Sequence, residues 1–79
     1  MAIWITCLRD GDVQPVTPTA SHDEIHHALD DMLDRHSREG RSVRNVLRDD
    51  GQPAWDVLDP KGSVLATYWI ARGSQGVRN

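Results

Sequence analysis

The feature that most restricts the possible folds is a single helical pattern with strand-like segments on both sides. Ser21 and Glu24 have the spacing of a capping box, in which each side chain accepts a hydrogen bond from the other residue's backbone amide. Gly40 stands where a C′ glycine commonly ends a helix. Between them one apolar stripe recurs at helical spacing: Ile25, Ala28, Leu29, Met32, Leu33 and His36. The pattern predicts one amphipathic helix over residues 21–40.

The segments before and after this helix have the composition of β-strands. Residues 2–8 form an apolar run with β-branched and aromatic members, and the less regular pattern of residues 42–48 predicts a further strand or an irregular connection. A short return strand is expected over residues 13–16. Pro15 confines it to an edge of the sheet, because proline cannot donate to a hydrogen-bonded ladder.

The clearest turn lies between two strand-like segments near the end of the chain, residues 55–59 and 63–71. Pro60 presets φ at the second position of the turn, and Gly62 can adopt the left-handed conformation that closes it. These elements together predict an α+β fold, in which one amphipathic helix packs on a three- to four-stranded, mostly antiparallel sheet in two layers.

The size of the chain limits it to one domain and favours association. At 79 residues, burial of apolar surface barely offsets chain entropy, so we expect a single domain over residues 1–72 and a flexible tail over 73–79. One helix cannot cover both faces of the sheet, and the last strand is apolar on both. Leu65 and Trp69 share the side without evident cover. We therefore predict a homodimer that forms through the second face of the sheet or its edge, with these two residues at its interface.

The net charge of −3 is unevenly distributed along the chain. Charged residues between positions 23 and 34 are all acidic, and five arginines follow between positions 35 and 48. This division predicts two faces of opposite potential, and arginines bind phosphates or carboxylates in a bidentate manner. The alternative for the arginines is an edge strand that is protected by charge against aggregation. The candidate partner-binding residues are Arg38, Arg41, Arg44, Arg48, Asp30, Asp31 and Asp34.

No motif in the sequence predicts catalysis, and we expect a non-enzymatic protein without cofactors. His22 and His26 have the four-residue spacing by which a helix offers two imidazoles to one metal ion. A third ligand would have to come from Asp30 or Cys7, and nothing in the spacing demands it. We therefore interpret the two histidines as solvated residues of an acidic helix and expect no metal. Cys7 alternates with apolar residues and is interpreted as part of the core.

Features that the sequence lacks indicate where the protein is located and disfavour nucleic-acid binding. The single cysteine excludes an intramolecular disulfide, and no segment has the form of a secretory leader or a membrane-spanning helix. A protein of the bacterial cytosol without membrane contact is expected. Aromatic residues are not interleaved with the arginines of residues 41–48, which disfavours direct nucleic-acid binding.

Three features together describe the general make-up of the chain: the capped acidic helix SHDEIHHALDDMLD, the arginine cluster and the hairpin AWDVLDPKGSVLATYWIA. In this make-up the chain resembles the small anti-CRISPR proteins of phages and mobile elements. The resemblance implies stoichiometric inhibition, by binding to a type I CRISPR–Cas surveillance complex (Cascade) or its nuclease and blocking access to target DNA. Either the arginines or the acidic helix face would meet complementary charge on that complex. A nucleic-acid-binding module and a histidine-based metal-binding regulatory module are the alternatives.

Overall fold

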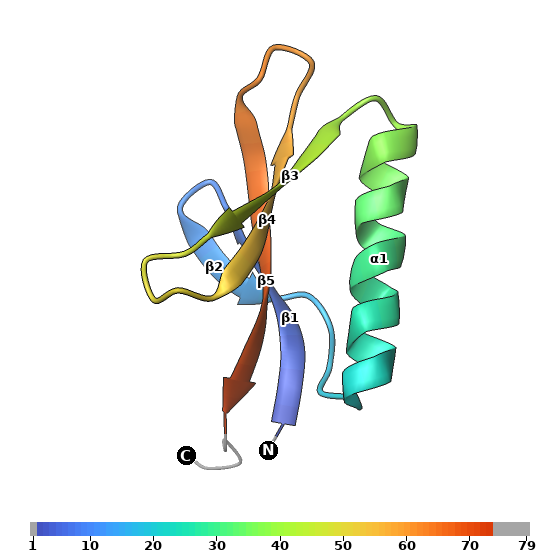
Figure 1. Ribbon diagram of the computed structural model, residues 1–79, viewed down its shortest axis with the longest axis vertical. Coiled ribbons are helices and arrows are strands. Elements are labelled where there is room, and N and C mark those ends of the chain that lie inside the picture. Colours follow the sequence, from blue (N-terminus) through green and yellow to red (C-terminus); the bar gives the residue numbers. More distant parts are fainter. Residues whose placement is uncertain (1, 74–79) are drawn as a thin grey trace.

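A computed structural model describes residues 2–73 and places one helix against one face of an antiparallel sheet (Figure 1). The α+β class is as predicted, but the sheet has five strands rather than three to four. The additional strand arises because the short return segment pairs fully with the first strand. The elements in chain order are β1 (Ala2–Arg9), β2 (Asp12–Pro15), α1 (His22–Arg38), β3 (Ser42–Leu47), β4 (Pro53–Leu58) and β5 (Val64–Gly73).

The strand order in the sheet is β2-β1-β5-β4-β3, so the first and last long strands of the chain lie side by side at its centre. All neighbouring strands are antiparallel, with Ile5 opposite Ile70 and Trp55 opposite Tyr68. Pro15 lies in β2 at one edge, where the absence of its N–H breaks no inner ladder. Pairing of β1 with β5 therefore ties the two ends of the described chain together.

Helix α1 begins and ends with the signals seen in the sequence. Ser21 is the N-cap, and both hydrogen bonds of its capping box with Glu24 are 3.2 Å long. The helix is followed by Glu39 as C-cap and by Gly40 with φ of 89°, a backbone conformation that favours glycine. Its apolar stripe buries Ile25 and Leu29 against the sheet. The strand residues of the same core cluster are Ile5, Cys7, Val57, Ala66 and Tyr68.

The turn between β4 and β5 is stabilised by the side chain of Asp59. Its Oδ1 accepts from the amides of Lys61 and Ser63, each at 2.9 Å, and Gly62 adopts φ of 89°. Gly73, the first residue of the predicted tail, is the last residue of β5. The rest of that tail, residues 74–79, lies outside the described residues. Within residues 2–73, no helix has the length and apolar character required to cross a membrane.

Candidate binding surfaces

The face of the sheet turned away from α1 has no second layer within the described chain (Figure 1). Successive side chains of a strand point to opposite faces, and Ile5, Cys7 and Tyr68 face the helix. Leu8 therefore lies on the other side, which we call the open face. Leu8 is 37% exposed, and Val13, its partner in β2, is 58% exposed. The pairing of β4 with β5 shifts register between Val57 and Leu58, which interrupts the alternation at Leu65, and Leu65 lines a hollow with His36 and Arg41 on the side of the helix. The open face thus presents apolar side chains to solvent.

Trp69 also belongs to the open face, yet it is 9% exposed. Its neighbours cover it: Thr6 is its partner in β1, and the guanidinium carbon of Arg48 lies 4.1 Å from its ring centroid. A cation at that position is attracted by the electron-rich face of the indole. Of the two predicted interface residues, Leu65 is exposed but lies beside His36 and Arg41 rather than beside Trp69, and Trp69 is largely enclosed by its own chain.

A polar rung crosses three strands of the open face beside these apolar residues. Arg44 in β3, Asp56 in β4 and Thr67 in β5 are successive cross-strand partners. Asp56 accepts a hydrogen bond from Thr67 Oγ1 at 2.8 Å and one from Arg44 Nη2 at 3.1 Å. Its side chain is 14% exposed. The carboxylate is therefore satisfied internally, and it fixes the orientation of the arginine above it.

The structure spreads the four predicted partner-binding arginines over separate elements and gives each a carboxylate partner. Arg38 contacts Asp34 at 2.5 Å on α1, and Arg41 contacts Glu39 in the following loop. Arg44 and Arg48 lie in and after β3, paired with Asp56 at 3.1 Å and with Asp50 at 3.7 Å. The pairs of Arg38 and Arg48 are exposed and therefore weak, about 0–1 kcal/mol each, so these two arginines can exchange partners. The arginines do not form one continuous basic cluster.

The predicted acidic residues occupy a different part of the molecule. Asp30, Asp31 and Asp34 are exposed on α1, whereas Ile25 and Leu29 of the same helix are buried against the sheet. This outer helix surface and the open face lie on opposite sides of the two layers (Figure 1). No ion pair found among residues 2–73 involves Asp30 or Asp31. Arg38 contacts Asp34 on the helix, but Arg44 and Arg48 lie in and after β3, so the acidic and basic candidates as a whole do not form one site.

Between α1 and the sheet, a short chain of hydrogen bonds joins three polar side chains. Arg41 Nε donates to His36 Nδ1 at 2.8 Å, and His36 Nε2 lies 3.0 Å from Tyr68 Oη. Because Nδ1 accepts, the neutral imidazole carries its proton on Nε2 and donates it to Tyr68. The helical pattern placed His36 near the apolar stripe, but no local signal connected it with a tyrosine 32 residues away.

The pKa values of His36 and Tyr68 are both shifted in the direction that favours the neutral side chain. Desolvation by burial, followed by the positive charges of Arg41 and Arg9, lowers the pKa of His36. Burial also raises the pKa of the Tyr68 hydroxyl, and the neighbouring Cys7 acts in the same direction. At neutral pH an uncharged histidine therefore meets an uncharged tyrosine, an arrangement suited to holding α1 on the sheet.

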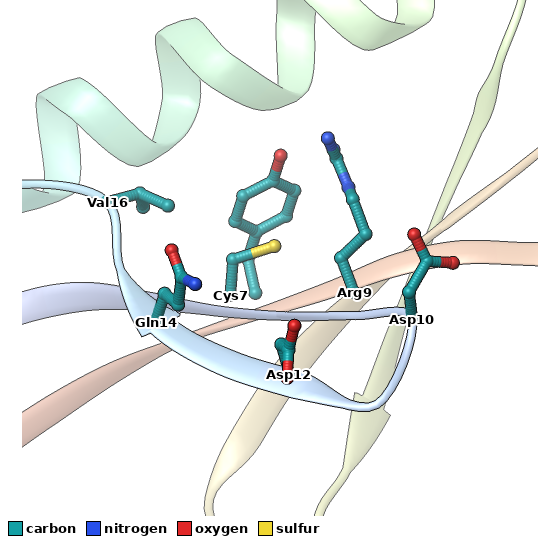
Figure 2. A pocket seen from close by; sticks show the side chains of 7 residues that line it. Cys7, Arg9, Asp10, Asp12, Gln14 and Val16 are labelled. Carbon is teal, nitrogen blue, oxygen red and sulfur yellow. The ribbon is translucent and has the colours of Figure 1, made fainter.

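A half-open groove of about 330 Å³ lies next to Tyr68, at the β1–β2 hairpin. Figure 2 shows Cys7 and Arg9 rising from the same side of β1 toward the helix, with Asp10 at the hairpin turn. The Cys7 thiol is buried, at 7% exposed, and its part in the core is as interpreted from the sequence. Arg9 beside Asp10 gives the groove mixed charge. The complete lining is Cys7, Arg9, Asp10, Asp12, Gln14, Val16 and Tyr68.

The imidazole rings of His22 and His26, near the start of α1, are in direct contact. His22 Nε2 and His26 Nε2 are 3.2 Å apart, and their ring centroids are separated by 4.3 Å. Residues 2–73 contain no group of three or more histidine, cysteine, aspartate or glutamate side chains that could hold a metal ion. Asp30 and Cys7, the possible third ligands considered from the sequence, are not brought to this pair as a ligand group.

Comparisons with protein-family models, with curated proteins and with solved structures found no match to this chain.

Proposed function

We propose that this chain is a non-enzymatic binding protein that works as a homodimer, with the open faces of two copies packed together. The observation that carries the proposal is a five-stranded sheet that, within residues 2–73, is covered by a helix on one face only, with Leu8 and Val13 exposed on the other. Exposed apolar side chains gathered on one sheet face are typical of an interaction surface. A second sheet face of the same shape would remove them from water.

A second copy fits this face because the face is electrically balanced. Arg44 is neutralised by Asp56, and Arg48 by Asp50, so two identical faces meet without a surplus of like charge. In a two-fold interface the same patch serves both partners, and each exposed Leu8 can pack on the other copy near Trp69. Tryptophan and arginine are the residue types most enriched among the strongest contacts of protein interfaces.

Such a dimer keeps both helices on the outside, with their acidic residues free to meet a partner. The resemblance to anti-CRISPR proteins suggests what that partner is: a type I CRISPR–Cas surveillance complex. We propose that Asp30, Asp31 and Asp34 occupy part of the positively charged surface by which such a complex binds the phosphates of target DNA. The protein would then inhibit by occupying that surface, without chemical turnover.

The homodimer is tested by measuring mass in solution with light scattering after gel filtration. We expect twice the chain mass of 8.9 kDa for the wild type and one chain mass for Leu8→Asp, because a buried carboxylate disfavours the interface. Leu47→Asp is the matched control, since Leu47 is 74% exposed on β3 and takes the same charge outside the open face. A wild-type mass of one chain contradicts the dimer.

Inhibition is tested separately with purified type I surveillance complexes and labelled target DNA. We expect the wild type to reduce DNA binding at near-equimolar ratio, and a variant with Asp30, Asp31 and Asp34 all changed to Asn to lose most of this effect. A variant with Arg44→Ala and Arg48→Ala serves as the comparison. Equal loss in both variants would remove the assignment to the acidic residues, and no inhibition of any type I complex would remove the proposed partner.

A further inference from the structure

The first two turns of α1 bring two imidazole nitrogens within the reach of one ion. His22 and His26 are both exposed, and their Nε2 atoms are 3.2 Å apart. Their rings are tilted by 47° to each other and are not stacked in parallel. The helix backbone sets the four-residue spacing, and the capping box at Ser21 fixes the turn on which His22 stands. The pair is therefore held by an ordered helix end.

The separation of the two nitrogens has the value that a tetrahedral metal ion requires. With metal–nitrogen bonds of about 2.0–2.1 Å, two nitrogens 3.2 Å apart subtend an angle of about 100–106° at the metal, close to tetrahedral. We propose that His22 and His26 form a two-point chelate for a borderline divalent ion such as Zn²⁺, Ni²⁺ or Cu²⁺. The ion replaces the contact between the two rings, and each ring then carries its proton on Nδ1.

The surroundings of the pair decide how many ligands the chain supplies. Asp23, His27 and Asp30 line one shallow side of it, and their two carboxylates favour a cation. Gln52, Trp55 and Arg72 line the other side, where the guanidinium opposes a cation. Since no third ligand group exists among residues 2–73, we infer that two coordination positions stay open to water. An open site of this kind can accept an imidazole or carboxylate from another molecule.

Calorimetric titration of the untagged full-length chain with ZnCl₂, NiCl₂, CuCl₂ and MgCl₂ tests the chelate. We expect one ion per chain, with affinity highest for Cu²⁺, as the usual order of divalent ions predicts, and none for Mg²⁺, which prefers oxygen ligands. His22→Gln and His26→Gln should each weaken binding by about 100-fold, because each change converts a two-point attachment into a single imidazole.

His36→Gln is the matched control, because His36 is a histidine of the same helix whose ring is bonded to Arg41 and Tyr68, away from the close nitrogen pair. Its affinity should equal that of the wild type. Equal weakening of metal binding in all three variants would mean that the ion is attracted loosely to an acidic helix, which contradicts the chelate. Wild-type affinity in His22→Gln or His26→Gln would also contradict the chelate. One ion per two chains, lost in His22→Gln and His26→Gln, would also support the chelate, with a second copy filling the open positions. Far-ultraviolet circular dichroism checks that each variant keeps its helix.

Discussion

The two faces of the sheet are built in different ways from the same strands. On the face under α1, Ile5 and Val57 are fully buried, and the apolar stripe of the helix supplies the cover. On the open face, Trp69 is buried by a cross-strand neighbour and by the side chain of Arg48, while Leu8 remains 37% exposed. Stability therefore depends on layer packing on one side and on individual side-chain pairs on the other.

The largest effect expected from this difference is at the covered face. Leu29 is 2% exposed, and Leu29→Ala should reduce the free energy of unfolding by about 2–5 kcal/mol, through lost burial and a cavity under the helix. Leu47→Ala is the control, since Leu47 is 74% exposed and the change should stay within about 0.5 kcal/mol. Urea denaturation followed by circular dichroism measures both. Similar losses would show that α1 does not dominate the core.

A smaller effect is expected where a polar contact joins helix and sheet. Tyr68→Phe removes the acceptor of the His36 Nε2 proton while keeping the ring, and should cost about 0.5–1.5 kcal/mol. Thr67→Val is the open-face counterpart: Asp56 loses one hydrogen bond but keeps that of Arg44, so the loss should be smaller. Urea denaturation of both variants compares the faces directly. A larger loss in Thr67→Val would reverse the comparison.

The parts of the fold that the sequence predicted are those with local causes. The capping box, Gly40, the turn closed by Gly62 and the edge position of Pro15 each depend on a few neighbouring residues, and each appears in the structure. The number of strands was underestimated, because four residues around a proline carry a weak strand signal. Their pairing with β1 depends on contacts across the hairpin rather than on their own propensity.

The candidate sites were harder to predict because they depend on distant pairings. A run of closely spaced arginines predicted one basic cluster, but the chain turns between them, so Arg41 joins His36 while Arg48 lies over Trp69. The contact between His36 and Tyr68 requires α1 and β5 to be docked first. The close approach of His22 and His26, by contrast, follows from helical spacing, and the structure adds the distance that gives it chemical meaning.

An effect smaller than that of Tyr68→Phe is expected on the open face, where the guanidinium of Arg48 covers the ring of Trp69. Arg48→Ala removes the guanidinium over Trp69 and should cost about 0.5–1 kcal/mol. Arg38→Ala is the matched control, because Arg38 is also paired with an aspartate but its side chain is 78% exposed, and the loss should be at most about 0.5 kcal/mol. Tryptophan fluorescence during urea denaturation measures the change. Equal losses would show that the cation–ring contact adds nothing to a surface ion pair.

The smallest effect is a pH dependence confined to the covered face. Because burial and nearby arginines lower the pKa of His36 below its ordinary 6.5, the unfolded chain takes up a proton before the folded chain does as the pH falls. Above that value the imidazole is neutral in both states and contributes no pH dependence. The free energy of unfolding should therefore fall as the pH decreases through the window just below 6.5.

His36→Gln tests this, since glutamine does not titrate. Its unfolding free energy between pH 7.5 and 5.5 should fall less steeply than that of the wild type, and the range stays above the ordinary pKa of 4.5 for Glu24, whose own pKa is lowered by the capping box. Identical slopes would mean that the histidine contributes no pH dependence. A steeper wild-type slope would show that helix docking, unlike the open face, weakens in mild acid, because a protonated His36 can no longer accept from Arg41.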